Sequence, residues 1–164
     1  RVLSGWRGDS ELAVLNAATE RRVSTDLFAV LSACEAWRAK TAGAFSARLG
    51  AGEPLGSSHA ACGAAARAEG APVVLDAATR TVVRPDGVIF AVDGLAKGYV
   101  LDAALGAARR AAPCARAAMI DIGGDIACFG ARAWTLGVAD PANLADNAAP
   151  ASVIQVSKIG RAHV

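Results

Sequence analysis

The chain contains the stretch Ala91-Val92-Asp93-Gly94-Leu95-Ala96-Lys97-Gly98-Tyr99-Val100-Leu101-Asp102. It follows an apolar, strand-like run at Val88-Ile89-Phe90 and opens a helix-like run from Tyr99 to Arg110. Such a junction suits an anionic ligand for three reasons. The N–H groups at the helix start are free, the glycine lets the backbone approach the ligand, and the lysine supplies a positive charge. The stretch therefore predicts a strand–turn–helix unit in which Lys97 is a candidate anion-binding residue.

A second glycine turn, Asp121-Ile122-Gly123-Gly124-Asp125, lies between two more strand-like runs. The two turns together favour a nucleotide-diphosphate site with acidic groups nearby for a metal. Neither turn matches the P-loop pattern G-x-x-x-x-G-K-[ST] or the dinucleotide pattern G-x-G-x-x-G. The alternative is two tight turns with glycine at positive φ, Lys97 as a solvated cation and Asp102 as a charge on the helix surface.

Strand pairs separated by short turns predict antiparallel hairpins with helices inserted between them, an α+β fold and not a doubly wound α/β fold. Asp9 is a candidate cap for a first helix, and Ser24 for a second whose Leu27, Leu31 and Cys34 share one face. Further helices are expected at 58–69 and 95–112. Strands are expected at 72–76, 81–83, 88–92, 117–122, 126–129, 134–139 and 152–156.

The composition argues against a membrane span, a nucleic-acid-binding protein and a zinc site. The 164 residues are enough for one domain with a core, and the hydrophobic content of 54% is raised by alanine. No uninterrupted apolar run reaches the roughly 20 residues needed to span a bilayer. The net charge of +2 gives no argument for nucleic acid. The cysteines are scattered without metal-ligand spacing, which disfavours a zinc site.

Several segments, in order along the chain, resemble those of one known family. They are Asp9-Ser10-Glu11-Leu12-Ala13-Val14-Leu15-Asn16, Thr41-Ala42-Gly43-Ala44-Phe45, Asp93 to Asp102, Ile120-Asp121-Ile122-Gly123-Gly124-Asp125-Ile126 and Trp134-Thr135-Leu136-Gly137-Val138-Ala139-Asp140-Pro141. With this order and spacing, the chain resembles the ApbE family of FAD:protein FMN transferases. Ser46 and Asp93 depart from the pattern, because many members have Asp and Gly there.

The resemblance implies an enzyme that binds FAD with Mg²⁺ and transfers FMN to a threonine of an acceptor flavoprotein, releasing AMP. Two alternatives remain: an FAD pyrophosphatase that gives FMN and AMP, and a catalytically silent flavin-binding domain. The family location implies a periplasmic protein, or one anchored in the inner membrane and facing the periplasm.

The resemblance also suggests roles for individual residues. Lys97 and Gly98 are expected at the diphosphate, with Asp102 orienting Lys97 or binding the ribose or adenine. The Gly94 carbonyl is expected on Mg²⁺, with Asp93 close to the same ion. The remaining candidates are Gly43, Ala44 and Phe45 at the isoalloxazine ring and Gly123, Gly124 and Asp125 at the flavin or ribityl chain.

Both ends of the sequence suggest a fragment. The family's other metal ligands belong to an H-[IL]-x-D-P-x-[TA]-G segment, which we expect downstream together with any catalytic side chain. We therefore expect a partial ApbE-like domain over residues 1–157 that is inactive by itself. The residues 158–164 back-translate to a common short-read sequencing adapter, so we expect them to be a non-native tail.

Overall fold

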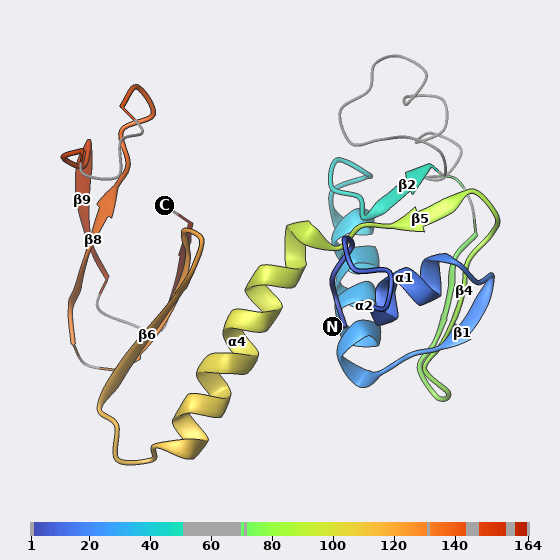
Figure 1. Cartoon of the computed structure of the whole chain (residues 1–164), viewed down its shortest axis with the longest axis horizontal. Helices are drawn as coiled ribbons and strands as arrows, with labels where there is room; N and C mark the ends of the chain where they lie inside the picture. Colours follow the sequence, from blue (N-terminus) through green and yellow to red (C-terminus); the bar gives the residue numbers. More distant parts are fainter. Residues whose placement is uncertain are drawn as a thin grey trace. The chain divides into compact units, whose positions relative to one another are not determined.

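The computed structural model describes residues 2–50, 70, 72–130, 132–143, 148–156 and 160–163. The chain divides into two compact units, Arg1–Ala96 and Lys97–Val164, which are described in turn (Figure 1). The helix expected at 58–69 lies outside the described residues.

The first unit opens with two helices, α1 (Glu11–Asn16) and α2 (Thr25–Lys40). Ser24 caps α2 as predicted, because its hydroxyl accepts a hydrogen bond from the Leu27 N–H. The prediction that Asp9 caps α1 is wrong: Ser10 is the cap and accepts from the Ala13 N–H at 3.0 Å. Asp9 is exposed and is bound by the Arg7 guanidinium.

Two small antiparallel sheets complete the first unit. One has the order β1 (Glu20–Arg22), β4 (Thr81–Val83), β3 (Val74–Asp76), and the other pairs β2 (Arg48–Gly50) with β5 (Val88–Phe90). The expected strand at 81–83 therefore forms with the predicted bounds, and those at 72–76 and 88–92 form with bounds two residues shorter. Strands β1 and β2 were not predicted.

The buried apolar side chains of the first unit come from both helices, from β4 and β5 and from the segment that precedes α4. They include Leu12, Leu15, Leu27, Val30, Leu31, Cys34, Val82, Val88, Phe90 and Val92. The face of α2 that the spacing of Leu27, Leu31 and Cys34 predicted is thus the buried one. Trp37, on the same helix, is half-exposed, with the Lys40 ammonium 5.2 Å from the centre of its ring.

The second unit holds most of α4 (Asp93–Ala111) and the strands β6 (Ala117–Ile122), β7 (Asp125–Gly130), β8 (Trp134–Val138), β9 (Ser152–Val156) and β10 (Gly160–His163). The order β10-β7-β6 forms one antiparallel sheet, and β8 pairs with β9. The expected α+β, mainly antiparallel fold is therefore confirmed. The backbone of β10 pairs with β7; a non-native origin of residues 158–164 remains a prediction.

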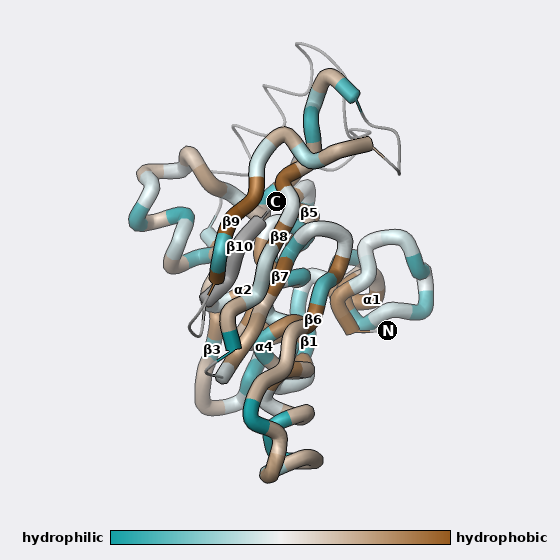
Figure 2. Tube along the Cα trace, turned by 90° about the vertical axis from the view of Figure 1, so that its left-hand side faces the viewer, coloured by the Kyte–Doolittle hydropathy of each residue, from teal (hydrophilic) through white to brown (hydrophobic). Residues whose placement is uncertain are grey.

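The core of the second unit lies between α4 and the β6–β7 hairpin. Leu101 and Leu105 of α4 are buried with Ala127 and Phe129 of β7, and apolar side chains of β6 pack around them. The hydrophobic residues of β7 are coloured brown in Figure 2. This packing fixes α4 along the hairpin and so determines which α4 side chains lie near the hairpin turn.

Candidate functional site

The turn Thr41–Phe45 ends α2 with the help of one side chain. The Thr41 hydroxyl donates to the Trp37 carbonyl at 2.9 Å and accepts from the Phe45 N–H at 3.0 Å. Ala42, the residue after the helix cap, is left-handed with φ +50°, and the Gly43 N–H donates to the Arg38 carbonyl, the bond pattern of a Schellman helix end. Gly43 itself has φ +85°. These bonds set the position from which the Phe45 ring extends.

Gly94 lies against the Phe45 ring. A Cβ at this position would be 3.0 Å from the Phe45 Cε2 atom, closer than side chains normally pack. The Val92 carbonyl accepts from Leu95 and Ala96, so α4 already begins at Asp93, two residues earlier than predicted. The structure therefore brings the predicted residues Phe45 and Gly94 together, with Asp93 and Gly94 exposed at the helix start.

A small pocket of about 170 Å³ lies beside Asp93. Its lining consists of Gly5, Trp6, Asn16, Leu49, Ile89, Phe90, Ala91 and Asp93. Asp93 is the only predicted site residue in this lining, within the part of the chain that the structure describes. Trp6, with 87% of its surface exposed, was not predicted as a site residue.

Asn16 holds the strand that leads into α4. Its side-chain amide donates to the Phe90 carbonyl and accepts from the Phe90 N–H, both at 2.9 Å. The amide thus occupies the place of a neighbouring strand beside β5. This role of Asn16 was not predicted from the sequence. The signal that could have indicated it is the place of Asn16 as the last residue of the first ApbE-like segment.

A largely buried ion pair supports the other side of the Thr41–Phe45 turn. Arg48 on β2 donates to both carboxylate oxygens of Glu35 on α2, at 2.8 and 2.7 Å, and Arg38 adds a bond at 3.1 Å. Burial raises the pKa of Glu35, but the bonds from the two guanidinium groups outweigh it and leave that pKa below its usual value. The pair links the residues before the turn to those after it.

In the second unit, Lys97 lies beside the glycine turn of the β6–β7 hairpin. Its ammonium is 3.7 Å from an Asp125 carboxylate oxygen and 3.9 Å from where a Cβ on Gly123 would be. Gly123 and Gly124 both have positive φ, which gives the two-residue turn a type I′ geometry. The Asp121 carboxylate accepts from the Gly124 N–H at 2.9 Å. The structure therefore brings the predicted residues Lys97, Gly123 and Asp125 together.

One face of α4 explains why Lys97 reaches this turn. Lys97, Leu101, Leu105 and Arg109 recur every fourth residue and so share a face of the helix. Along β7, Asp125, Ala127 and Phe129 alternate on one side of the strand and meet this face in the same order, through an ion pair, apolar packing and a cation–π contact. Lys97 is therefore positioned by the core of its own unit.

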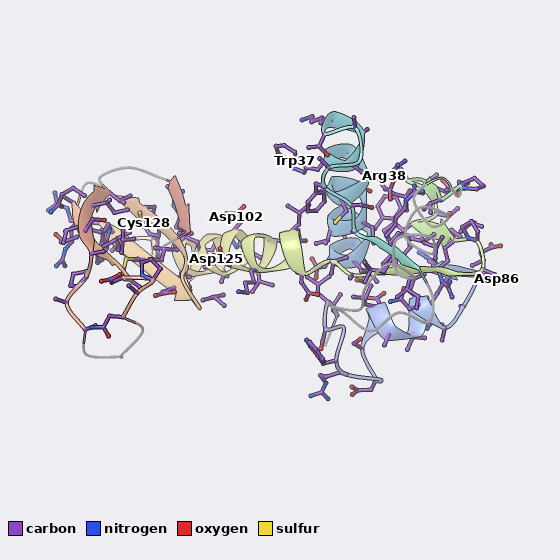
Figure 3. All side chains as sticks on the ribbon, turned by 90° about the horizontal axis from the view of Figure 1, so that it is seen from above. Trp37, Arg38, Asp86, Asp102, Asp125 and Cys128 are labelled. Atoms are coloured by element: carbon purple, nitrogen blue, oxygen red, sulfur yellow. The ribbon has the colours of Figure 1, made fainter. Side chains whose placement is uncertain are left out.

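Asp102 does not share that face. It follows Lys97 by five residues, which places it roughly 140° around the helix axis. It is exposed on α4, whereas Asp125 is on β7 (Figure 3). Lys97 is paired with Asp125. The roles suggested for Asp102, orienting Lys97 or binding the ribose or adenine, remain predictions. Gly98 is half-buried on the same helix, next to Lys97.

The described residues do not form a complete metal site. No group of three or more His, Cys, Asp and Glu side chains able to hold a metal ion occurs among them. Gly94 belongs to the first turn of α4, where a carbonyl normally accepts the N–H four residues later. Gly94 and Asp93 could offer an ion one backbone oxygen and one carboxylate, so water or phosphate oxygens would have to complete the six ligands of a Mg²⁺ ion.

Two solved structures share this fold. The ApbE protein of Thermotoga maritima superimposes with a TM-score of 0.77 at 22% identity, and the flavinyl transferase ApbE of Pseudomonas stutzeri, in its apo form, with 0.68 at 18%. These matches cover 97% and 96% of this chain but 55% and 53% of the other chains, so this chain spans about half their length.

The ApbE family model matches residues 1–162, and the chain belongs to the ApbE family. The predicted family resemblance is therefore confirmed. No match was found among curated proteins. In the described residues, no helix is both long and apolar enough to cross a membrane.

Proposed function

We propose that the protein transfers FMN from FAD to a threonine hydroxyl of an acceptor flavoprotein, in a reaction that requires Mg²⁺. Membership of the ApbE family and a fold shared with a flavinyl transferase support a flavin substrate. The observation that carries the proposal is the position of the Lys97 ammonium beside the Gly123-Gly124 turn and Asp125. A lysine beside exposed backbone at a glycine turn suits the diphosphate of FAD.

In this reaction the acceptor oxygen forms a bond to the phosphorus of the FMN half of FAD. The bond from that phosphorus to the bridging oxygen breaks, AMP leaves with that oxygen, and the hydroxyl proton passes to solvent or to a base. Lys97 would hold the diphosphate and offset the charge on the leaving phosphate. The Gly94 carbonyl is proposed as one Mg²⁺ ligand, and the other ligands and any base are proposed to come from outside the described residues.

Asp125 would keep the Lys97 side chain beside the turn until the diphosphate replaces it as the partner. Lys97 is 54% exposed, so a ligand can reach its ammonium without rearrangement of the core. In the first unit, Phe45 and the turn that precedes it are proposed to border the flavin ring. That position is supported by the close approach of the Phe45 ring to Gly94, which lies three residues before Lys97.

The test uses the complete protein encoded at the locus, with FAD, Mg²⁺ and an acceptor domain that carries the target threonine. Covalent flavin on the acceptor is followed by in-gel fluorescence and by mass. We expect a mass increase equal to FMN, lost when the threonine is changed to alanine. Lys97→Ala should lower kcat/KM about tenfold to a hundredfold, the usual effect of losing one charge-assisted hydrogen bond.

Arg110→Ala is the matched control, because it removes a positive charge from an exposed position on the same helix. It should leave kcat/KM within about twofold. Release of AMP and free FMN without labelling would favour the FAD pyrophosphatase instead. Bound FAD with neither product would favour the silent flavin-binding domain. Equal losses in the two variants would refute the role of Lys97.

We also propose that the protein is periplasmic, or anchored in the inner membrane and facing the periplasm, as the family location suggests. A fusion to a reporter that is active only after export, made at the natural start of the gene, tests this. A reporter that is active only in the cytoplasm would contradict it.

A further inference from the structure

A second pocket lies in the second unit, where α4 connects to β6. It has a volume of about 600 Å³ and is lined by Arg109, Ala112, Pro113, Ala115, Arg116, Phe129 and Gly130. Cavities of this size are typical of small-molecule sites. The lining contains two guanidinium groups and, among the described residues, no carboxylate. The pocket is therefore electropositive.

The two guanidinium groups have N–H donors without a partner among the described residues. In the described part of the chain, neither the Arg109 nor the Arg116 side chain makes a hydrogen bond or an ion pair. Arg109 lies 4.7 Å above the centre of the buried Phe129 ring, which holds one face of its planar group while its N–H edge stays available. A cation in the last turn of a helix is stabilised by the helix dipole, which accounts for Arg109 at the end of α4. Arg116 lies beyond the end of the helix, so the helix dipole does not account for the position of Arg116.

Gly130 fixes the backbone on the other side of the pocket. It has φ +108°, and a Cβ there would be 2.2 Å from the Arg116 carbonyl oxygen and 2.6 Å from the Ala117 Cα. Only glycine allows the end of β7 to cross the start of β6 this closely. The Ala115 N–H donates to the Ala112 carbonyl at 2.9 Å and tightens the same connection. The backbone that carries Arg116 is therefore set by packing.

We propose that this pocket binds a small phosphate-bearing anion through Arg109 and Arg116. Guanidinium groups present a planar fork of N–H donors that matches phosphate oxygens, and two of them offset most of the charge of a phosphate monoester. The site is distinct from Lys97, which lies at the opposite end of the same face of α4 and at the other end of β7. It does not depend on the reaction proposed above.

The test is a titration of the complete protein, with arginine side chains labelled by ¹⁵N, at low ionic strength. Inorganic pyrophosphate and AMP are the probes, and the Nε–Hε signals of Arg109 and Arg116 are the readout, assigned through Arg109→Lys and Arg116→Gln. We expect saturable shifts of both signals. Arg116→Gln should weaken binding at the Arg109 signal about tenfold or more. Tighter binding of AMP than of pyrophosphate would identify a nucleotide as the ligand. Tighter binding of pyrophosphate would identify a simple phosphate, and both outcomes support the site.

Two controls separate this pocket from other positive groups. Lys97→Ala should leave the shifts of Arg109 and Arg116 unchanged, because that variant affects only the candidate FAD site. Arg132 makes the same kind of contact, 4.8 Å above the Trp134 ring, but does not line the pocket. Arg132→Gln should therefore not change the binding. Unsaturable shifts, or equal shifts at Arg132, would overturn the proposal. Arg116→Gln keeps the test decisive if Arg109 variants fold poorly, because the Arg116 side chain makes no hydrogen bond or ion pair with the described residues.

Discussion

At the scale of single residues, the chain contains the same ion pair in two environments. Arg48 binds Glu35 through two hydrogen bonds with only 4% of the arginine side chain exposed, whereas Arg7 binds Asp9 in the same way with 54% of each side chain exposed. Water screens an exposed pair and already solvates its members, so such a pair adds little. The loss of one partner from a buried pair leaves a charge without compensation.

Arg48→Met should therefore lower the free energy of unfolding by on the order of 2–4 kcal/mol, somewhat less than a fully buried pair because Arg38 still binds Glu35. Arg7→Met is the matched control and should cost less than about 1 kcal/mol. Urea denaturation of the two variants measures both values. Similar losses for the two would mean that burial does not determine the strength of the Glu35–Arg48 pair.

The pH dependence follows from the lowered pKa of Glu35. Because the folded protein holds this carboxyl proton less tightly than the unfolded chain, the ion pair contributes stability above the unfolded pKa, about 4.3. That contribution is lost as the pH falls through the lower, folded pKa. The stability difference between wild type and Glu35→Gln should be largest near pH 7 and should shrink below about pH 4. Urea denaturation at a series of pH values checks this, and a gap that widens in acid would contradict it.

At the scale of elements, α4 offers a direct comparison of two glycines. A Cβ on Gly94 would be 3.0 Å from the Phe45 Cε2 atom, whereas a Cβ on Gly106 would be 3.4 Å from the end of the flexible Arg110 side chain. Gly106→Ala should raise the free energy of unfolding by roughly 0.5–1 kcal/mol, since alanine loses less entropy in a helix. Gly94→Ala should raise the free energy of unfolding by less than this, or lower it, because the Phe45 ring must move aside. Thermal and urea unfolding of both variants decide this, and equal gains would show that the ring moves freely.

The turn of the β6–β7 hairpin is sensitive in a different way. Gly123→Ala forces a side chain into the left-handed region at φ +59° and should cost about 1–2 kcal/mol. Gly123→Asn should cost less, because asparagine is common in type I′ turns. If the Lys97 site needs this turn, FAD affinity should fall more for Ala than for Asn, as measured by equilibrium titration. The opposite order would indicate that turn geometry does not control the site.

The predictable elements are those with an apolar pattern and clear boundaries. The predicted strands at 117–122, 134–139 and 152–156 match β6, β8 and β9 within one residue, because each is apolar and bounded by turn residues. Strand β1 has the sequence Glu-Arg-Arg and is exposed along its length, so nothing in its residues indicates a strand. It forms because β4 lies beside it, which is information from elsewhere in the chain.

At the scale of the whole molecule, contacts between distant segments define the candidate site. Asn16 and Phe90 are joined by two hydrogen bonds across 74 positions of sequence. Asn16→Ala would leave the Phe90 N–H and carbonyl without partners in a part-buried place, at a cost of about 2–4 kcal/mol for the two groups. Asn16→Asp keeps an acceptor for the Phe90 N–H but sets a carboxylate oxygen against the Phe90 carbonyl oxygen, so it should lose as much as the alanine variant or more. Urea denaturation ranks the two variants; a clearly more stable Asp variant would mean that the bond from the Asn16 amide N–H to the Phe90 carbonyl contributes little.

Such contacts also explain which parts of the site the sequence could predict. Lys97, Gly123 and Asp125 were predicted from local turn chemistry and from the family resemblance, and the structure brings them together. The pairing of Lys97 with Asp125, the Glu35–Arg48 bond and the role of Asn16 depend on strand register and helix packing. Strand register and helix packing cannot be determined from a single sequence, because contacts between residues far apart in the chain depend on which strands are neighbours and in which register they pair.

The tight approach of Gly94 to Phe45 has an evolutionary consequence. Any descendant that gains a side chain at position 94 must also shrink the ring at position 45, or the start of α4 will move. Substitutions at the two positions are therefore expected to be correlated among related proteins, although 49 positions separate them. A glycine at 94 should be inherited together with an aromatic residue at 45, and a lineage that loses one should lose the other soon afterwards.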